Sequence, residues 1–176
     1  DDNAKIELEN DINEMTAMLN SYVSFVRGET AEKIEETNLN ILIENICKSN
    51  SSNSFKIKYN VEKNIKTLCR PIQIKRAIQN IVDNAKRYAD KIDIELGIKN
   101  NELYISIADN GPGIPEKNFE DVFKPFFTLD PSRNKLKGES GLGLTIARDI
   151  IRSHGGEIKL LKSKMNGLKI ILYLPL

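Results

Sequence analysis

A strand-like segment that ends in a carboxylate and two glycines is the first candidate for chemistry in this sequence. Apolar and less apolar residues alternate over 102–109, which predicts a half-buried strand. Asp-Asn-Gly-Pro-Gly then occupies residues 109–113. Such a strand delivers the Asp109 carboxylate to the rim of a core, and the glycines let the backbone turn and approach a ligand closely. Read alone, the pentapeptide also fits a plain turn.

Two asparagines four residues apart form the second candidate. Asn80 and Asn84 fall on one face of a helix predicted over 71–89, with Arg87 and Tyr88 one turn later. Amides buried in a helix that is otherwise rich in isoleucine need partners. An amide oxygen suits Mg²⁺, whose other ligands are usually water and phosphate oxygens, and an arginine adds positive charge for phosphates. The alternative is that both asparagines face solvent.

A glycine-rich segment at residues 138–144 forms the third candidate, because it opens a predicted helix. Glycines there expose backbone N–H groups at the positive end of the helix dipole, which favours phosphate. The segment is not a Walker loop, since no Lys-Ser/Thr follows its last glycine, and no strand leads directly into it as in a dinucleotide-binding fold. A glycine-rich hinge is the alternative interpretation.

Hydrophobic periodicity predicts the elements that position these residues. Strands are expected at 55–61, 67–69, 92–98, 102–109, 157–161 and 168–174, and helices at 38–46, at 71–89 and from 142 to the glycines at 155–156. Asn38 or Asn40 can cap the first of these helices, and residues 49–54 read as a loop. Residues 124–140 have few apolar side chains and read as a lid. The sum is a two-layer α/β sandwich with a mixed sheet of about five strands and helices on one face.

The first thirty residues predict a separate long helix. Leu8, Ile12, Met15, Leu19, Tyr22 and Val26 are spaced alternately four and three residues apart. This is a heptad seam, which must pack against another helix of this chain or of a partner. An amphipathic helix lying on its own domain is the alternative. We expect this helix at 1–30, a linker at 31–36 and the main domain at 37–176.

The composition and charge of the chain limit the classes of protein to which it can belong. Residues 1–36 carry a net charge of −7 and the remainder +8, a mild basicity that fits an anionic ligand, an acidic protein face or a solvated lysine-rich surface. No dense basic run with interleaved aromatics indicates nucleic-acid binding. No apolar run approaches the ~20 residues of a membrane span, so we expect a soluble polypeptide. Cys47 and Cys69 read as buried free thiols in a reducing compartment.

Together, the three segments above and a fourth at residues 123–127 resemble the catalytic and ATP-binding domain of sensor histidine kinases, in the GHKL superfamily. Residues 80–88 resemble the N box of that family, 109–113 its G1 box, 123–127 its F box and 138–144 its G2 box. The resemblance covers about residues 37–176, and the heptad helix resembles the second helix of the family's dimerisation and phosphotransfer hairpin. Four boxes in the family's order are far more specific than any one of them.

The resemblance implies roles for individual residues. Asp109 would accept a hydrogen bond from the adenine amino group, and Asn84 would hold Mg²⁺ at the phosphates. Arg87 and Tyr88 would contact the nucleotide, and residues 124–140 would form its lid. The full set of implied nucleotide-binding residues is Asn84, Arg87, Tyr88, Asp109, Gly111, Gly113, Ile114, Phe127, Gly138, Gly141, Leu142, Gly143 and Leu144, with catalytic roles for Asn80, Arg87, Arg133 and Lys135.

Asn80 favours one reaction over the others in the superfamily. DNA gyrase, mismatch-repair ATPases and the related serine kinases commonly have a glutamate four residues before the magnesium-binding asparagine, as a base that activates water or a hydroxyl. Asn80 stands in that place here and cannot take a proton. A neutral imidazole needs no such base, because its nitrogen already has a free lone pair. Phosphoryl transfer to histidine is therefore favoured over hydrolysis.

Two departures from the family matter. Thr128 stands where many members have an arginine after the F-box aromatics, and Arg133, Lys135 or Lys137 could substitute for it from the lid. The phosphoacceptor histidine is expected on a helix that is not in this chain. The only histidine, His154, precedes two glycines at a helix end and reads as structural.

The leading hypothesis is therefore the Mg-ATP-dependent kinase core of a two-component sensor. Its expected partners are a histidine-bearing dimerisation helix, a response regulator and a second copy of the full-length protein, with a cytoplasmic location and a membrane only through a parent protein. An ATPase or a protein-serine kinase of the same fold, or a nucleotide-sensing module without catalysis, are the alternatives.

Overall fold

The fold is that of a computed structural model, which describes residues 12, 16, 23, 32–62, 64–129 and 141–176. The expected helix at 1–30 therefore lies outside the described residues, apart from Ile12, Thr16 and Val23, which are helical and exposed. The part of the expected lid at 130–140 lies outside them as well. None of the helices in the described part of the chain is both long and apolar enough to cross a bilayer.

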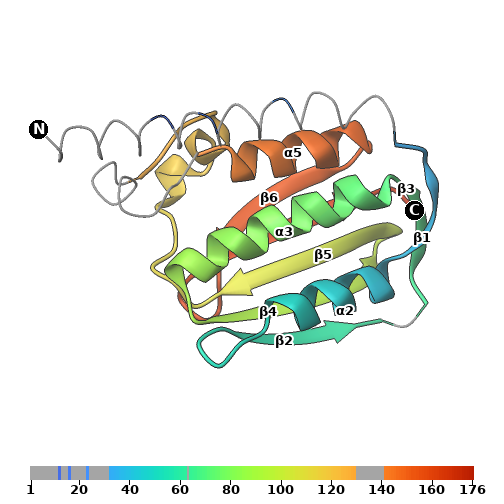
Figure 1. Cartoon of the computed structure of the whole chain (residues 1–176), viewed down its shortest axis with the longest axis horizontal. Coiled ribbons are helices and arrows are strands. Elements are labelled where there is room, and N and C mark those ends of the chain that lie inside the picture. The colour runs from blue at the N-terminus through green and yellow to red at the C-terminus, as the bar shows by residue number, and fades with distance from the viewer. Residues whose placement is uncertain (1–11, 13–15, 17–22, 24–31, 63, 130–140) are drawn as a thin grey trace, which may run out of the picture.

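The described elements are strands, helices and two 3₁₀ turns (Figure 1). In chain order they are β1 (Glu35–Asn38), α2 (Leu39–Asn50), β2 (Lys56–Val61), β3 (Lys66–Cys69), α3 (Pro71–Tyr88), β4 (Lys91–Lys99), β5 (Glu102–Asp109), the 3₁₀ turns η1 (Glu116–Asn118) and η2 (Asp121–Phe123), α5 (Gly143–Ser153), β6 (Glu157–Lys162) and β7 (Leu168–Leu174).

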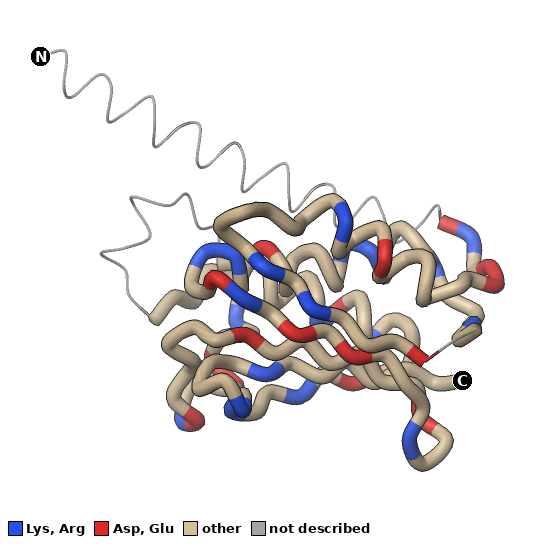
Figure 2. Tube along the Cα trace, turned by 90° about the horizontal axis from the view of Figure 1, so that it is seen from below, with Lys and Arg blue, Asp and Glu red and all other residues tan. Residues whose placement is uncertain are grey.

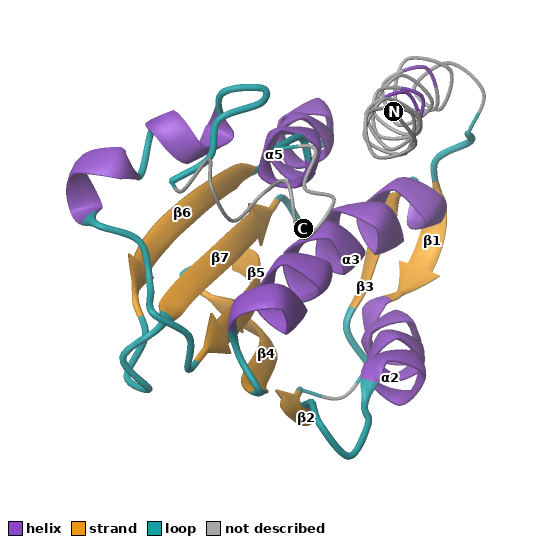
Figure 3. Ribbon diagram, turned by 60° about the vertical axis from the view of Figure 1, so that its left-hand side comes forward, coloured by secondary structure: helices purple, strands orange, loops and turns teal. Residues whose placement is uncertain are grey.

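The main sheet has five strands in the order β2-β4-β5-β7-β6. Strands β2 and β4 run parallel and the other neighbours antiparallel, so the sheet is mixed. Helices α2, α3 and α5 all lie on one face of it (Figures 1 and 3). The predicted two-layer sandwich is confirmed.

A second, two-stranded sheet was not predicted. The strand expected at 67–69 is present as β3, but it pairs with β1 rather than with the main sheet. Strand β1 begins inside the segment that was interpreted as a linker, and only its pairing with the later β3 reveals it. Thr67 also bonds to the carbonyl of Pro175 at 3.3 Å, which ties the small sheet to the end of the chain.

Side chains from outside each helix determine where two of them begin. The Asn38 carboxamide accepts hydrogen bonds from the N–H groups of Asn40 and Ile41, so Asn38 is the cap of α2. Helix α3 has Pro71 at its first position but no cap from its own preceding residue. The Glu32 carboxylate takes that place and accepts the N–H groups of Ile72 at 2.6 Å and Gln73 at 3.1 Å.

The loop expected at 49–54 is wrong at its start, because α2 continues to Asn50. Asn50 is buried and donates to the carbonyl of Ile46 and to the Gln79 amide, which in turn donates back to Asn50. Lys86 bonds to the same Asn50 oxygen at 2.8 Å. Partners on α3 thus hold the last turn of α2, and local sequence cannot show them.

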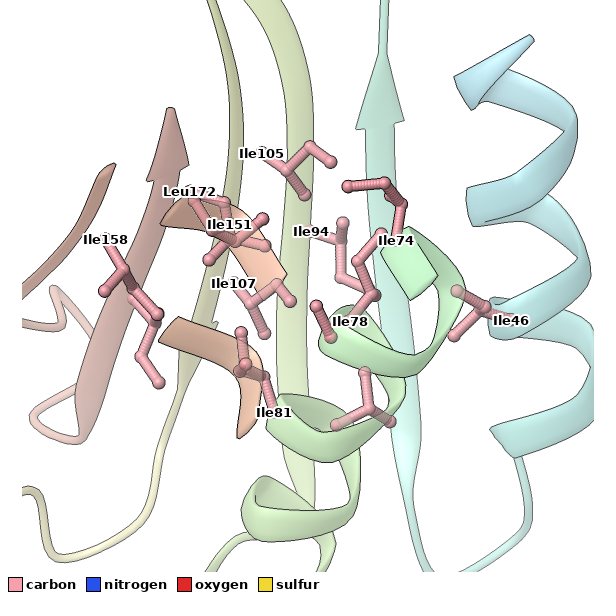
Figure 4. Close-up of a cluster of buried hydrophobic side chains, with 14 of the residues drawn as sticks. Ile46, Ile74, Ile78, Ile81, Ile94, Ile105, Ile107, Ile151, Ile158 and Leu172 are labelled. Carbon is pink, nitrogen blue, oxygen red and sulfur yellow. The ribbon is translucent and has the colours of Figure 1, made fainter. Parts of the chain in front are cut away.

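The core lies between the sheet and the helices (Figure 4). The hydrophobic periodicity that predicted a helix over 71–89 corresponds to a buried face of α3, since Ile74, Ile78, Ile81 and Ala85 are all buried. They pack toward Ile94, Ile105 and Ile107 of the central strands, with Ile46, Ile151, Ile158 and Leu172 around them. Each fully buried isoleucine contributes roughly 1.5–3 kcal/mol. This packing fixes α3 across the middle of the sheet.

His154 and the two cysteines have the structural surroundings expected of them. His154 Nε2 accepts the N–H of Arg70 at 3.1 Å, so Nδ1 carries the proton and donates to the Ile150 carbonyl at 2.7 Å. Cys47 and Cys69 are buried free thiols. Burial, with Glu44 nearby, raises the pKa of Cys47 to about 11, so its thiol stays protonated.

Acidic and basic residues are interspersed along the described trace (Figure 2). Several form exposed pairs, such as Lys66 with Glu36 at 2.8 Å and Lys124 with Asp121 at 2.6 Å. Exposed pairs of this kind contribute about 0–1 kcal/mol each. The fold is therefore held by its apolar core and backbone pairing rather than by these charges.

Candidate functional site

A cavity of about 400 Å³ lies between α3, the end of β5 and the start of α5. This volume suits a small molecule. Among the sequence-predicted site residues, its lining includes Asn80, Asn84, Arg87, Tyr88, Asp109, Gly113, Ile114, Phe127, Gly141, Gly143 and Leu144. Gly111 and Leu142 adjoin these residues without lining the cavity, and Arg133, Lys135 and Gly138 lie outside the described residues. Three segments far apart in the sequence therefore meet at one cavity.

Asp109 is held at one end of the cavity by two backbone groups. Its Oδ1 accepts the N–H of Gly111 at 2.8 Å and the N–H of Leu168 at 3.1 Å. The residue is only 9 % exposed. Among the described residues, nothing donates to the second carboxylate oxygen, Oδ2. One oxygen therefore fixes the orientation of the carboxylate and the other remains available to a ligand.

The surroundings of Asp109 also change its acidity. Burial raises the pKa of its carboxyl group above the ordinary value of 3.8. The hydrogen bonds from Leu168 and Gly111 favour the ionised form and offset part of this rise. An acid in this position gains from a ligand that donates a further hydrogen bond to it, because such a donor compensates the lost hydration.

Gly167 makes the close packing around Asp109 possible. A Cβ on Gly167 would overlap both Oδ1 and the backbone carbonyl of Asp109. Gly113 also lies close to this turn, since a Cβ there would lie 3.3 Å from the Gly167 carbonyl. The turn between β6 and β7 is therefore packed directly on the 109–113 loop, although 59 positions separate Asp109 from Leu168 in the chain.

Helix α3 provides one long wall of the cavity. Asn80 and Asn84 both line it, as their spacing predicted. The Nδ2 group of Asn80 is buried and has no hydrogen-bond partner among the described residues. A buried donor without a partner is costly in an otherwise satisfied structure. The wall therefore presents at least one amide group that a ligand oxygen can satisfy.

Asp83 lines the same wall beside Asn84 and was missed by the sequence interpretation. Its Oδ1 accepts the Gln79 side-chain amide at 2.8 Å, and Gln79 is in turn held by Asn50 of α2. This chain of hydrogen bonds fixes the Asp83 carboxylate from outside the cavity.

The residues of this wall fit a magnesium ion that is also bound by phosphate. Within the described ranges, no group of three or more His, Cys, Asp or Glu side chains could hold a metal ion by itself. Mg²⁺ commonly takes only one or two protein oxygens and keeps water and phosphate oxygens as its other ligands. The side-chain oxygen of Asn84 offers one such ligand. The unpartnered Nδ2 of Asn80, one turn away, is a donor for a phosphate oxygen or a metal-bound water rather than a ligand.

The opposite end of the cavity is built from turns and a helix start. Helix α5 begins at Gly143, where Gly143 and Leu144 line the cavity. The first amides of a helix have no acceptor within it. Their position at this wall suits an anion. Phe127, Thr128 and Leu129 form the adjacent wall.

One backbone hydrogen bond joins the two segments at this end. The N–H of Phe126 donates to the carbonyl of Gly141 at 3.1 Å. Both residues have positive φ, 64° at Phe126 and 61° at Gly141, and Phe126 is 61 % exposed. A Cβ on Gly141 would lie 2.8 Å from Phe126 Cα. The close contact therefore requires glycine at position 141 and a strained backbone at Phe126.

Comparison with known protein families shows to which family the chain belongs. The family described as histidine kinase-, DNA gyrase B-, and HSP90-like ATPase matches residues 69–176. The chain belongs to this family. The matched segment includes every described residue that lines the cavity.

Individual members of this ATPase family include sensor histidine kinases similar to the chain. The sensor histidine kinase GtrS of Pseudomonas aeruginosa is 30 % identical over 175 residues, which cover 94 % of the chain and 34 % of GtrS. The sensor histidine kinase CpxA of Escherichia coli is 36 % identical over 107 residues, which cover 60 % of the chain and 23 % of CpxA. The chain thus spans about a quarter to a third of the length of these curated relatives.

A solved structure of a histidine kinase domain is also similar to the chain. The histidine kinase domain of the E. coli osmosensor EnvZ is 30 % identical, with a TM-score of 0.64. The alignment covers 84 % of the chain and 91 % of the EnvZ domain. The predicted resemblance to the catalytic and ATP-binding domain of sensor histidine kinases is confirmed.

The family pattern identified most of the cavity but not all of it. Residues that line it without having been predicted as site residues are Asp83, Pro112, Val122, Thr128, Leu129, Ile146 and Leu168. The Asn-Gly pair at 166–167 is typical of a tight turn between two strands, and it is the sequence signal that lies nearest to Leu168. Thr128 was noted as a departure from the family, and the structure places it on the cavity wall.

Proposed function

We propose that this domain binds Mg-ATP and transfers the γ-phosphate to a histidine on a dimerisation helix outside this chain. One observation carries the proposal: Asp109, with one carboxylate oxygen still available, lies across a 400 Å³ cavity from a helix start suited to phosphate. Membership of a family that contains histidine kinases supports it.

Asp109 would select adenine. Its free oxygen can accept a hydrogen bond from the exocyclic amino group of adenine. Guanine presents a carbonyl oxygen at the corresponding position, which would leave the carboxylate unpaired and repelled, at a cost of roughly 1–3 kcal/mol. Binding of ATP rather than GTP is therefore expected.

The phosphates would lie between α3 and the start of α5. Asn84 would hold Mg²⁺ through its side-chain oxygen, and Arg87 and Tyr88 would contact the nucleotide from the same helix. When bound, Mg²⁺ neutralises negative charge on the phosphates and the leaving group. The backbone of Gly141, Leu142 and Gly143 would contribute N–H groups.

The absence of a base at Asn80 favours histidine as the acceptor. An amide cannot take a proton, so Asn80 would not activate water or a hydroxyl, whereas a neutral imidazole needs no activation. The unpartnered Nδ2 of Asn80 would instead donate to the bound phosphates or to water at the metal. The domain would act by positioning the γ-phosphate and neutralising charge.

We also propose the wider setting of the domain. Residues 1–30 would form part of the dimerisation hairpin, 31–36 the linker and 37–176 the catalytic domain. The full-length protein would be a homodimeric sensor that acts on a response regulator. It is not expected to bind nucleic acid. The resemblance to sensor histidine kinases implies that the domain is the cytoplasmic portion of a membrane-bound parent.

A second function is supported by Thr128. It lies on the cavity wall where the family resemblance implies an arginine, so a cation that stabilises transfer is missing from that position. A module that senses nucleotide without catalysis would fit this residue. Arg133 or Lys135 would have to replace the arginine in a competent kinase.

Phosphate transfer to a supplied histidine distinguishes these functions. The chain is mixed with the histidine-bearing segment of its parent protein and with γ-labelled ATP, and label on the segment is followed with time. Transfer is expected for the wild type and is expected to fall at least about tenfold for Asn84→Ala, because a lost metal ligand weakens phosphate positioning.

Other outcomes of the same assay identify the alternatives. Tight Mg-ATP binding with no more transfer than Asn84→Ala would favour the sensing module. Steady phosphate release without the histidine-bearing segment would favour an ATPase, and phosphoserine on an added partner would favour a serine kinase.

A further inference from the structure

Arg148 on α5 makes an unusual set of contacts with the segment that leads into the cavity. Its guanidinium carbon lies 4.5 Å from the centre of the Phe123 ring, and its Nη2 donates to the Phe123 carbonyl at 3.2 Å. The side chain is only 18 % exposed. A third contact, 3.8 Å from Nη1 to the exposed carboxylate of Glu120, is weak by comparison.

A second side chain of α5 reaches the same acceptor. Thr145 Oγ1 donates to the Phe123 carbonyl at 2.9 Å. Thr145 and Arg148 are three residues apart and so share one face of the helix. The 3₁₀ turn η2 ends at Phe123, and the next residue is extended, which leaves this carbonyl free to accept both donors. The gold segment that contains η2 lies beside the start of α5 in Figure 1.

The anchored carbonyl lies just before the cavity wall. Four residues after Phe123, the chain reaches Phe127, which lines the cavity with Thr128 and Leu129. Helix α5 forms the adjacent wall through Gly143 and Leu144. The separation of these two walls is therefore set on one side by the Phe126–Gly141 backbone bond and on the other by the contacts to Phe123.

We propose that Arg148 is a positioning residue for the triphosphate, because it fixes the 127–129 wall against the start of α5. This inference rests on the proposed function, since it assumes that the phosphates lie at this end of the cavity. Arg148 itself does not line the cavity. It acts through Phe123 and has no part in holding Asp109 at the other end.

The chemistry of the contact requires arginine rather than any cation. A planar guanidinium stacks on an aromatic ring and donates a hydrogen bond from its edge at the same time. Lysine offers a single ammonium point charge and cannot do both in this geometry. Methionine keeps much of the apolar stem while removing the charge and every donor.

Nucleotide affinities of Arg148→Met and Arg148→Lys test the inference. For the wild type and each variant, binding of Mg-ATP and of adenosine is measured by titration calorimetry. We expect Arg148→Met to weaken Mg-ATP binding about tenfold and adenosine binding less than about twofold, because only the phosphate end loses its fixed wall. Arg148→Lys should fall between Arg148→Met and the wild type.

Arg152→Met is the matched control. Arg152 lies one turn further along α5, is exposed, and should leave both affinities unchanged. The midpoint of thermal unfolding, measured on all variants, shows whether each remains folded at the temperature of the titration. Arg148→Lys supplies the same comparison if Arg148→Met proves to be unfolded.

Two results would overturn the inference. Equal losses for Mg-ATP and adenosine would mean that Arg148 only stabilises the fold, and unchanged Mg-ATP affinity would mean that the wall does not depend on it. A wild-type chain that binds adenosine and Mg-ATP equally would overturn the phosphate site itself. A wild-type chain that binds neither would overturn the proposed function together with this inference.

Discussion

The two ends of the cavity are built in different ways. At the end proposed to bind adenine, Asp109 closes the central strand β5, and backbone N–H groups from its own loop and from the neighbouring β7 fix its carboxylate. At the end proposed to bind the phosphates, a helix start meets a 3₁₀ turn and a loop, joined by one backbone bond and by side chains.

Because of this difference, one end of the cavity has a fixed geometry and the other can change its shape. Strand register determines the position of Asp109, because β5 is paired along its length with both β4 and β7, and a shift there would break the sheet. The segments at the phosphate end lie outside the sheet, so they can change position without unfolding it. Under the proposed function, a rigid site would select the base and an adjustable site would hold the phosphates.

Gly167→Ala is expected to break the rigid end most severely. The added Cβ would overlap the Asp109 carboxylate and its backbone carbonyl, and no side-chain rotation relieves a backbone overlap. We expect a loss of Mg-ATP affinity of about a hundredfold, corresponding to roughly 2.7 kcal/mol, measured by titration.

Gly97→Ala is the matched control for Gly167→Ala. A Cβ at position 97 would meet only the ends of the Glu62 and Tyr104 side chains, at 2.8 and 2.9 Å, and both can move away. Affinity close to that of the wild type is expected. If Gly167→Ala bound as well as Gly97→Ala, the orientation of Asp109 would not depend on the β6–β7 turn.

At the adjustable end, alanine substitutions at Gly141 and Gly143 should differ from each other. A Cβ on Gly141 would lie 2.8 Å from Phe126 Cα and would require a side chain at a φ of 61°. A Cβ on Gly143 would have its nearest neighbour at 3.9 Å. We expect Gly141→Ala to weaken Mg-ATP binding about tenfold and Gly143→Ala to change it less than about threefold. Equal effects would show that the Phe126–Gly141 contact is unimportant.

The pH dependence of stability gives the smallest expected effect. Because burial raises the pKa of Asp109, the native state binds a proton more readily than the unfolded state. The free energy of unfolding of the wild type, relative to Asp109→Asn, should therefore rise as the pH falls from neutral toward 3.8. Urea denaturation of both proteins across this range measures it. A relative stability that fell on acidification would mean that the hydrogen bonds to Asp109 outweigh its burial.

The sequence predicted those parts of the site that depend on local periodicity. The spacing of Asn80 and Asn84 placed both on one helix face, and the alternation over 102–109 placed Asp109 at a strand end. Each prediction used residues within one element, whose geometry repeats regularly. The isoleucines of α3 were assigned to the core for the same reason.

Contacts between distant segments could not be predicted in this way. Leu168 donates to Asp109 across 59 positions, and Arg148 reaches Phe123 across 25. Strand β1 exists because β3 pairs with it, and the last turn of α2 depends on partners in α3. In each case the partner is set by the tertiary fold and not by any local pattern.

The hydrogen bond from the Leu168 N–H to Asp109 limits how far the domain can be shortened if Asp109 is to select adenine as proposed. A truncated chain that stopped after α5 would retain all four motif segments and both asparagines of α3. It would nevertheless lose the strand that borders β5 and, with it, one of the two donors to the acid. If Asp109 recognises adenine as proposed, a minimal nucleotide-binding version of this domain must keep the terminal hairpin, even though none of the four boxes lies within it.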